Sequence, residues 1–132
     1  MEWLKDTSVI GQFSIGCFIA IVFLQSGIDK VVDWKGNHSW LTGHFKNTFL
    51  SSLITPMLAV VTIFEVAAGV VALCGLVCLF WCQDASCIYY ALIIGLLSLL
   101  MLLFGQRIAK DYDGAKTIAI YIGVLLIGLI FF

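Results

Sequence analysis

The sequence predicts an all-α protein: a membrane-embedded, antiparallel four-helix bundle with a short interfacial amphipathic helix between the first two spans. The chain has 132 residues, of which 62 % are hydrophobic and only 11 % are charged. Four apolar runs, at residues 8–28, 53–81, 86–105 and 115–132, are each long enough to cross a bilayer, which takes about 20 helical residues. Nearly every charge lies between these runs. The runs lack the alternation of barrel strands, so helices are the structure that satisfies their backbone amides.

The composition also limits the classes of function. We expect one domain, residues 1–132, because the longest polar segment, residues 29–52, is too short to be a soluble catalytic domain. The net charge is −1 and no basic stripe is present, so we expect the lipid bilayer and not a nucleic acid as the partner. No P-loop, GxSxG, HExxH or zinc-type cysteine spacing occurs, which predicts no metal site and leaves enzymatic activity open.

The first predicted span, residues 8–28, ends in a polar cluster. Gln25 and Asp29 are four residues apart, as are Ser26 and Lys30, so the two pairs lie on adjacent helix faces. The cluster is either an interfacial anchor with a local ion pair, or the polar mouth of an intramembrane cavity. Such a mouth would suit a quinone headgroup or the tail of a partner protein.

The segment at residues 37–49 has the pattern of a surface helix. Its apolar side chains recur at helical spacing and form one mostly apolar face. We expect a helix in the headgroup layer, capped by Asn37 or Ser39, because aromatic rings settle at that depth. The alternative is a loop folded over the end of the bundle. The residues expected at the interface are Trp34, Trp40, Phe45 and Phe49.

Glu65 is the outlier of the second span, residues 53–81. It lies about ten residues into the span, hence about 15 Å from its edge. A charge near the bilayer centre costs at least about 2.5–3.5 kcal/mol, which makes this carboxyl a functional candidate. Its helical face carries small residues, so we expect it to point into the bundle. There it is either an inert, hydrogen-bonded carboxyl or a ligand or proton site.

Depth along the spans selects the expected neighbours of Glu65. Gln25, Ser98 and Tyr121 are expected at a similar depth, whereas Lys30 lies at the edge and should reach Glu65 only through water or a helix bend. Because burial favours the neutral form of a carboxyl group, we expect Glu65 to be protonated near neutral pH unless a cation reaches it.

A link of four residues joins the second span to the third, and predicts a helical hairpin. Cys82 and Cys87 flank this hairpin, so a disulfide between them is one expectation. The other is that all five cysteines serve as small hydrophobic residues. Small residues also recur every four positions within the spans, which lets helices pack closely inside the bundle or in a homo-oligomer.

The distribution of Lys and Arg predicts the orientation of the chain. Six of the seven Lys and Arg residues lie in or directly beside two segments, residues 29–52 and 106–114. Basic loops stay on the cytoplasmic side of a membrane. We therefore expect both termini on the non-cytoplasmic side, in the inner (plasma) membrane of a bacterium.

Three short motifs resemble the DoxX/DoxD-like family of small four-span membrane proteins. They are FLQSGIDK at residues 23–30, EVAAG at residues 65–69 and LCGL at residues 73–76. The resemblance covers the four-span layout and roughly the first two-thirds of the chain. It implies a small four-helix bundle of a family named for subunits of a thiosulfate:quinone oxidoreductase attached to a terminal oxidase. Other relatives assist membrane complexes.

Together these observations predict an integral membrane subunit or accessory protein of a larger, redox-linked complex, with other membrane-protein subunits as partners. We expect no cofactor of its own, and a quinone or lipid as the molecule that a cavity beside Glu65 would hold. Two alternatives stay open. One is a subunit of a quinone-interacting oxidoreductase of the thiosulfate:quinone type, in which Glu65 transfers protons; the other is a transporter of small solutes or protons.

Overall fold

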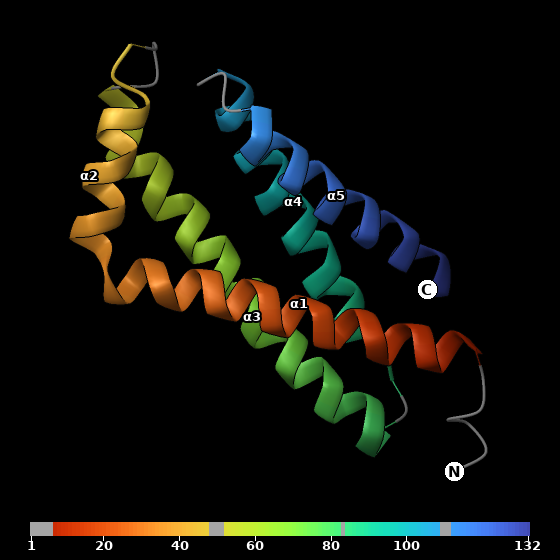
Figure 1. Ribbon diagram of the computed structural model, residues 1–132. Coiled ribbons are helices and arrows are strands. Elements are labelled where there is room, and N and C mark those ends of the chain that lie inside the picture. The colour runs from red at the N-terminus through yellow and green to blue at the C-terminus, as the bar shows by residue number, and fades with distance from the viewer. Residues whose placement is uncertain (1–6, 48–51, 83, 109–111) are drawn as a thin grey trace.

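The computed structural model describes residues 7–47, 52–82, 84–108 and 112–132. Throughout these residues the chain is helical, with no strand (Figure 1). The four long helices are α1 (Thr7–Val32), α3 (Ile54–Cys82), α4 (Ser86–Ile108) and α5 (Tyr112–Gly128), and α5 continues into a 3-10 turn, η3 (Leu129–Phe131). A short helix, α2 (Trp34–His44), lies between α1 and α3.

The four long helices are each apolar and long enough to cross a membrane, α5 together with its terminal turn. This confirms the predicted all-helical fold with four long apolar helices. The helices extend beyond the apolar runs that predicted them, because charged residues are compatible with helix at its ends: α1 reaches Val32 instead of residue 28, and α4 reaches Ile108 instead of residue 105.

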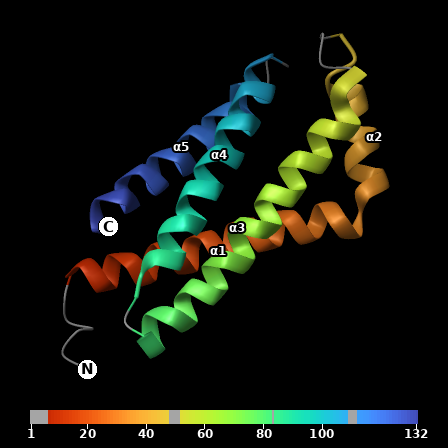
Figure 2. The same ribbon diagram turned by 180° about the vertical axis from the view of Figure 1, so that it is seen from behind.

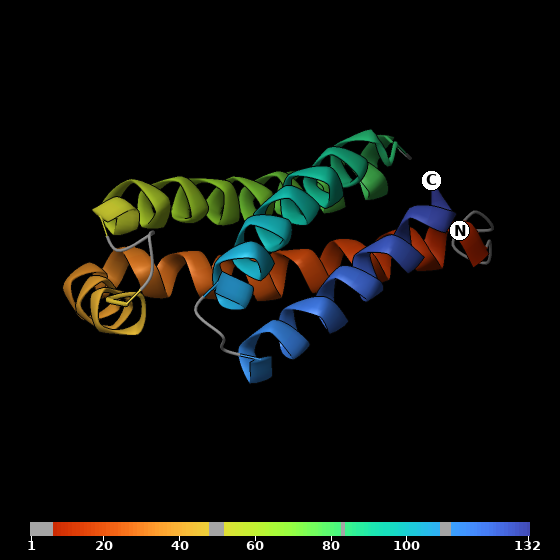
Figure 3. The same ribbon diagram turned by 90° about the horizontal axis from the view of Figure 1, so that it is seen from above.

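The long helices pack as a bundle. α3, α4 and α5 lie next to one another in that order, and α1 crosses them on one side (Figures 2 and 3). The core consists of side chains that are almost completely buried between them, among them Ile19, Phe23, Ala72, Leu92 and Leu125. Large apolar side chains also lie exposed on the outside of the bundle.

Two glycines let α1 and α3 approach closely. A Cβ atom added to Gly69 would lie 2.9 Å from the backbone nitrogen of Leu24, and one added to Gly27 would lie 3.2 Å from that of Val66. Any larger residue would therefore push the two backbones apart. This crossing decides which polar side chains of the two helices meet.

α2 begins three residues earlier than predicted. Its N-cap is Asp33, whose side chain accepts a hydrogen bond from the backbone nitrogen of Gly36 at 3.3 Å. The predicted cap, Asn37, lies inside the helix and donates its side-chain amide to the carbonyl of Asp33 at 2.8 Å. Asp33 is a better N-cap than Asn37, because its side chain pairs with the backbone N–H of Gly36 and its negative charge is favourable at the positive end of the helix dipole.

The aromatic residues expected at the interface lie in different surroundings. Phe45 is only 5 % exposed and packs with Ile54 in a small second core. Trp40 is 59 % exposed and stacks on His44, with ring centroids 4.5 Å apart. Trp34 is half-buried, and Phe49 lies outside the described residues.

Of the two alternatives for Cys82 and Cys87, a disulfide or two unlinked cysteines, the structure has the second, with both thiols free. Cys82 is exposed at the end of α3, whereas the thiol of Cys87 lies within hydrogen-bonding reach of Cys78. The reason is the approach of α4 to α3 one turn before Cys78, where a Cβ atom on Gly75 would lie 3.1 Å from the carbonyl carbon of Cys87.

Candidate functional site

The centre of the site is an ion pair between α1 and α3. Lys30 Nζ lies 3.0 Å from Glu65 Oε2, and it also donates a hydrogen bond to Ser26 Oγ at 2.7 Å. The side chain of Glu65 is 1 % exposed and that of Lys30 is 18 % exposed. The inward orientation predicted for Glu65 is therefore present, with a cation beside the carboxylate.

Direct contact with Lys30 differs from the expectation that this residue reaches Glu65 only through water or a bend. α1 continues as a regular helix through Lys30, so the residue belongs to the same rigid element as Ser26. Gly27 and Gly69 bring that element against α3 one turn from Glu65. We expected Glu65 to be protonated near neutral pH only if no cation reached it. Because Lys30 is in direct contact with Glu65, that condition is not met.

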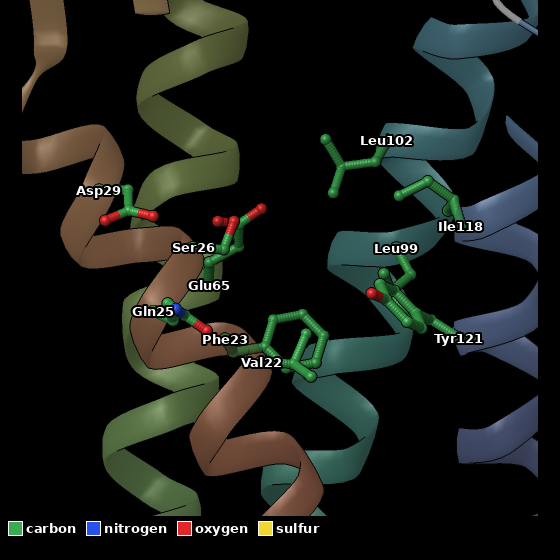
Figure 4. A pocket seen from close by; sticks show the side chains of 10 residues that line it. All are labelled: Val22, Phe23, Gln25, Ser26, Asp29, Glu65, Leu99, Leu102, Ile118 and Tyr121. Atoms are coloured by element: carbon green, nitrogen blue, oxygen red, sulfur yellow. The ribbon is translucent and has the colours of Figure 1, made fainter. Parts of the chain in front are cut away.

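A cavity of about 320 Å³ adjoins the ion pair (Figure 4). Figure 4 shows its polar side chains on α1 and α3, facing a mostly apolar wall on α4 and α5. The lining residues are Val22, Phe23, Gln25, Ser26, Asp29, Glu65, Leu99, Leu102, Ile118 and Tyr121. A molecule in this cavity would meet hydrogen-bonding groups on one side and hydrocarbon on the other.

The structure brings most of the predicted site residues together. Gln25, Asp29, Glu65 and Tyr121 all line this cavity. Ser98 does not: it is completely buried, and its hydroxyl has no hydrogen-bond partner in the part of the chain that the structure describes. Neighbouring helix positions face different directions, and on α4 it is Leu99 and Leu102 that face the cavity.

A second chamber of about 290 Å³ lies on the other side of the ion pair, beneath α2. It shares Ser26, Leu102 and Ile118 with the first cavity. Its other lining residues are Lys30, Asn37, Trp40, Leu41, Phe45, Ile54, Met57, Leu58, Val61, Met101, Gly105 and Gln106. The sequence did not reveal this chamber, because its walls come from all five helices and no single segment carries its pattern.

The two spaces differ in charge. Asp29 and Glu65, both acidic, line the first cavity, whereas the charged side chain on the wall of the second is Lys30. Hydrogen bonds fix α2 above the second chamber: His38 Nε2 lies 2.7 Å from Thr55 Oγ1, and His44 Nε2 lies 3.4 Å from Gln106 Oε1. The ion pair thus stands between an acidic space and a basic one.

The side chains around the ion pair include both donors and acceptors of hydrogen bonds. An ammonium, an amide and a phenol can donate hydrogen bonds to a carbonyl ligand, and the carboxylates can accept them. Within the described ranges, no group of three or more His, Cys, Asp or Glu side chains is placed to hold a metal ion.

Compared with known proteins, the chain matches no family model, no curated protein and no solved structure.

Proposed function

We propose that this chain is an integral membrane subunit or accessory protein of a larger, redox-linked membrane assembly, and that the cavity beside Glu65 holds a quinone- or lipid-sized amphipathic molecule. The observation that carries the proposal is the buried Lys30–Glu65 ion pair on the wall of a cavity that is polar on one side and apolar on the other. The redox link comes from the resemblance of its motifs to the DoxX/DoxD-like family.

Energetics favour a functional reason for this ion pair. Moving two charged groups out of water costs several kcal/mol per ion. The attraction between the two charges offsets this cost only when their geometry is good. Hydrophobic residues of similar volume often hold a bundle together as well or better. Ionisable groups inside membrane segments are therefore functional candidates, and this one adjoins space for a ligand.

A quinone headgroup matches the chemistry of the cavity walls. Its two carbonyl oxygens need donors, which the amide of Gln25 and the hydroxyl of Tyr121 supply. Its ring and tail need apolar contacts, which Phe23, Leu99 and Ile118 supply. The side chain of Gln25 is exposed on the outside of the bundle, so a lipid-soluble molecule would enter sideways from the bilayer.

Ligand binding is tested by purifying the protein in nanodiscs of native lipid and identifying bound molecules by native mass spectrometry. We expect a quinone or a single lipid in about one-to-one ratio, and less of it in Tyr121→Phe, which removes one donor. Tyr90→Phe is the matched control, because that tyrosine is 61 % exposed and lies outside the cavity. Equal occupancy in both variants would contradict the proposal.

The proposal includes an antiparallel membrane arrangement with α2 at the cytoplasmic surface. The start of α1 and the end of α5 lie at the end of the molecule remote from α2, which supports a shared side for the two termini (Figures 1 and 3). The distribution of Lys and Arg supports the non-cytoplasmic side. Of two reporters fused after Phe132, the one that works only outside the cytoplasm should be active. Activity of the reporter that works only in the cytoplasm would contradict this orientation.

The ion pair also favours a second candidate, a quinone-interacting oxidoreductase subunit in which Glu65 transfers protons. A carboxylate hydrogen-bonded to an ammonium and bordering a cavity can accept a proton from a bound quinol. Glu65→Gln separates the candidates. It should leave assembly and binding intact for an accessory protein, but abolish quinol oxidation for a catalytic subunit although the complex still assembles.

A further inference from the structure

We propose that the second chamber, beneath α2, binds a single-chain amphipathic anion of the long-chain carboxylate type, and that Glu65 takes up one proton when it binds. The inference relies on the membrane placement proposed above, but not on any occupant of the first cavity. It follows from the position of Lys30, the charge of the chamber walls and the shared ion pair.

The headgroup site consists of donors. A lysine ammonium has three N–H donors, and among the described residues Ser26 and Glu65 take two of them. The chamber also contains the side chain of Gln106, whose oxygen faces His44 at 3.4 Å, so that its NH₂ group is left for a ligand. No Asp or Glu is among the described residues that line the chamber. An anion is the headgroup that such walls favour.

The remaining walls suit one hydrocarbon chain. Leu41, Met57, Val61 and Met101 line the chamber on three different helices. Its volume of about 290 Å³ limits the guest to a single chain, and the methionines adapt to such a guest because their side chains are flexible. A two-chain phospholipid would have to leave one chain outside, which makes the single-chain anion the better fit.

Proton uptake follows from charge balance. Lys30 neutralises Glu65 when the chamber holds no anion. An anion at Lys30 would place two negative charges beside one positive charge in a region where Glu65 is 1 % exposed. A buried charge without a partner is expensive and is instead neutralised by protonation. A proton on Glu65 restores neutrality, so anion binding and proton binding favour each other.

Other titratable groups surround this site and have to be separated from Glu65. Lys30 on α1 is the ion-pair partner of Glu65, and Asp29 on α1 and Tyr121 on α5 line the first cavity beside it. From α4, only apolar residues line that cavity. On the side of α2, the imidazole of His44 lies 3.4 Å from the side-chain oxygen of Gln106. A pH effect that comes from Glu65 must therefore survive Asp29→Asn and His44→Asn.

The test uses a brominated long-chain alkylsulfonate in phosphatidylcholine nanodiscs. A sulfonate stays ionised, so the pH dependence reports the protein, and bromine quenches the emission of Trp40 on the chamber wall. Trp40→Phe provides the background of the other tryptophans. The affinity should rise as the pH falls, by at most tenfold per pH unit, which is the limit for uptake of one proton. A brominated alcohol with the same chain should bind at least tenfold more weakly.

Variants assign the effect to the ion pair. Glu65→Gln leaves Lys30 without an internal counterion, so it should bind the sulfonate at least tenfold more tightly than the wild type at high pH, without the pH slope. The double variant Lys30→Gln/Glu65→Gln leaves no buried charge, so it should fold and lose saturable quenching. Lys35→Gln, which removes an exposed lysine of α2, should bind like the wild type.

Three results would overturn the inference: a wild-type affinity that does not change with pH, equal binding of the alcohol, or a slope that disappears in Asp29→Asn or His44→Asn instead of Glu65→Gln. Brominated phosphatidylcholine that quenches Trp40 as well as the sulfonate does would reject the single-chain ligand. Absence of a bound quinone leaves all these curves unchanged, so failure of the proposed function is distinguishable from failure of this inference.

Discussion

Removing Lys30 should destabilise the protein much more than removing both members of its ion pair. Lys30→Gln leaves the carboxylate of Glu65, which is 1 % exposed, without a counterion. The loss of one partner of a buried ion pair costs about 3–5 kcal/mol. Glu65→Gln is milder, at about 1–2 kcal/mol, because Lys30 is 18 % exposed, keeps its bond to Ser26 and can donate to the glutamine oxygen.

The double variant should be nearly as stable as the wild type. Lys30→Gln/Glu65→Gln replaces two buried charges by two amides that can bond to each other, at a cost of about 1 kcal/mol. The coupling between the two positions is then about 3 kcal/mol or more, because the single effects together far exceed the double effect.

These free energies can be measured by reversible unfolding in mixed micelles of dodecylmaltoside and SDS, followed by circular dichroism. Lys35→Gln is the matched control, since it removes an exposed lysine and should change the stability by less than about 0.5 kcal/mol. Additivity of the two single effects within about 0.5 kcal/mol would refute the buried ion pair.

Three further outcomes are expected. Gly69→Ala should cost about 1–3 kcal/mol of unfolding free energy, since its new Cβ would lie 2.9 Å from the backbone of α1, whereas Gly43→Ala, with nothing within 4 Å, should be neutral or stabilising by up to about 1 kcal/mol. Under mild oxidation, mass spectrometry should find Cys78 linked to Cys87, and a link from Cys87 to any other cysteine would contradict the packing of α3 on α4. Asp84 accepts hydrogen bonds from the hydroxyl and the backbone amide of Ser86 at the start of α4, and these bonds hold the pKa of Asp84 below its usual value. The stability that they contribute is present above the ordinary carboxyl pKa and is lost as the pH falls through the lower folded-state pKa. Asp84→Ala should therefore lower the pH dependence of stability: as the pH falls below about 4, the thermal unfolding midpoint of the variant should decrease less than that of the wild type.

Hydropathy by itself determined the number and approximate positions of the long helices. Apolar runs of membrane-spanning length have to be helical, because only helices satisfy their own backbone groups within one segment. The inward direction of Glu65 was also predictable, since a small-residue face and the cost of a charge in lipid both favour it. Depth selected Gln25, Ser98 and Tyr121, and the structure places Gln25 and Tyr121 on the cavity wall. Asp29, predicted as part of the polar cluster that ends the first span, also lines the cavity.

Only the tertiary structure decided which polar groups meet. Depth along a helix does not specify the crossing of two helices, and the close approach at Gly27 and Gly69 is what brings Lys30 to Glu65. Depth also does not specify direction around a helix, which is why Ser98 is buried away from the cavity wall.

The same limit applies to both ends of the bundle. The packing of α4 at Gly75 places Cys87 beside Cys78, whereas nearness in sequence had favoured Cys82. The chamber beneath α2 is built from all five helices, so no local pattern could reveal it. Hydropathy is a property of each segment by itself, but a binding site depends on the distances between segments, and close backbone contacts at a few small residues determine those distances.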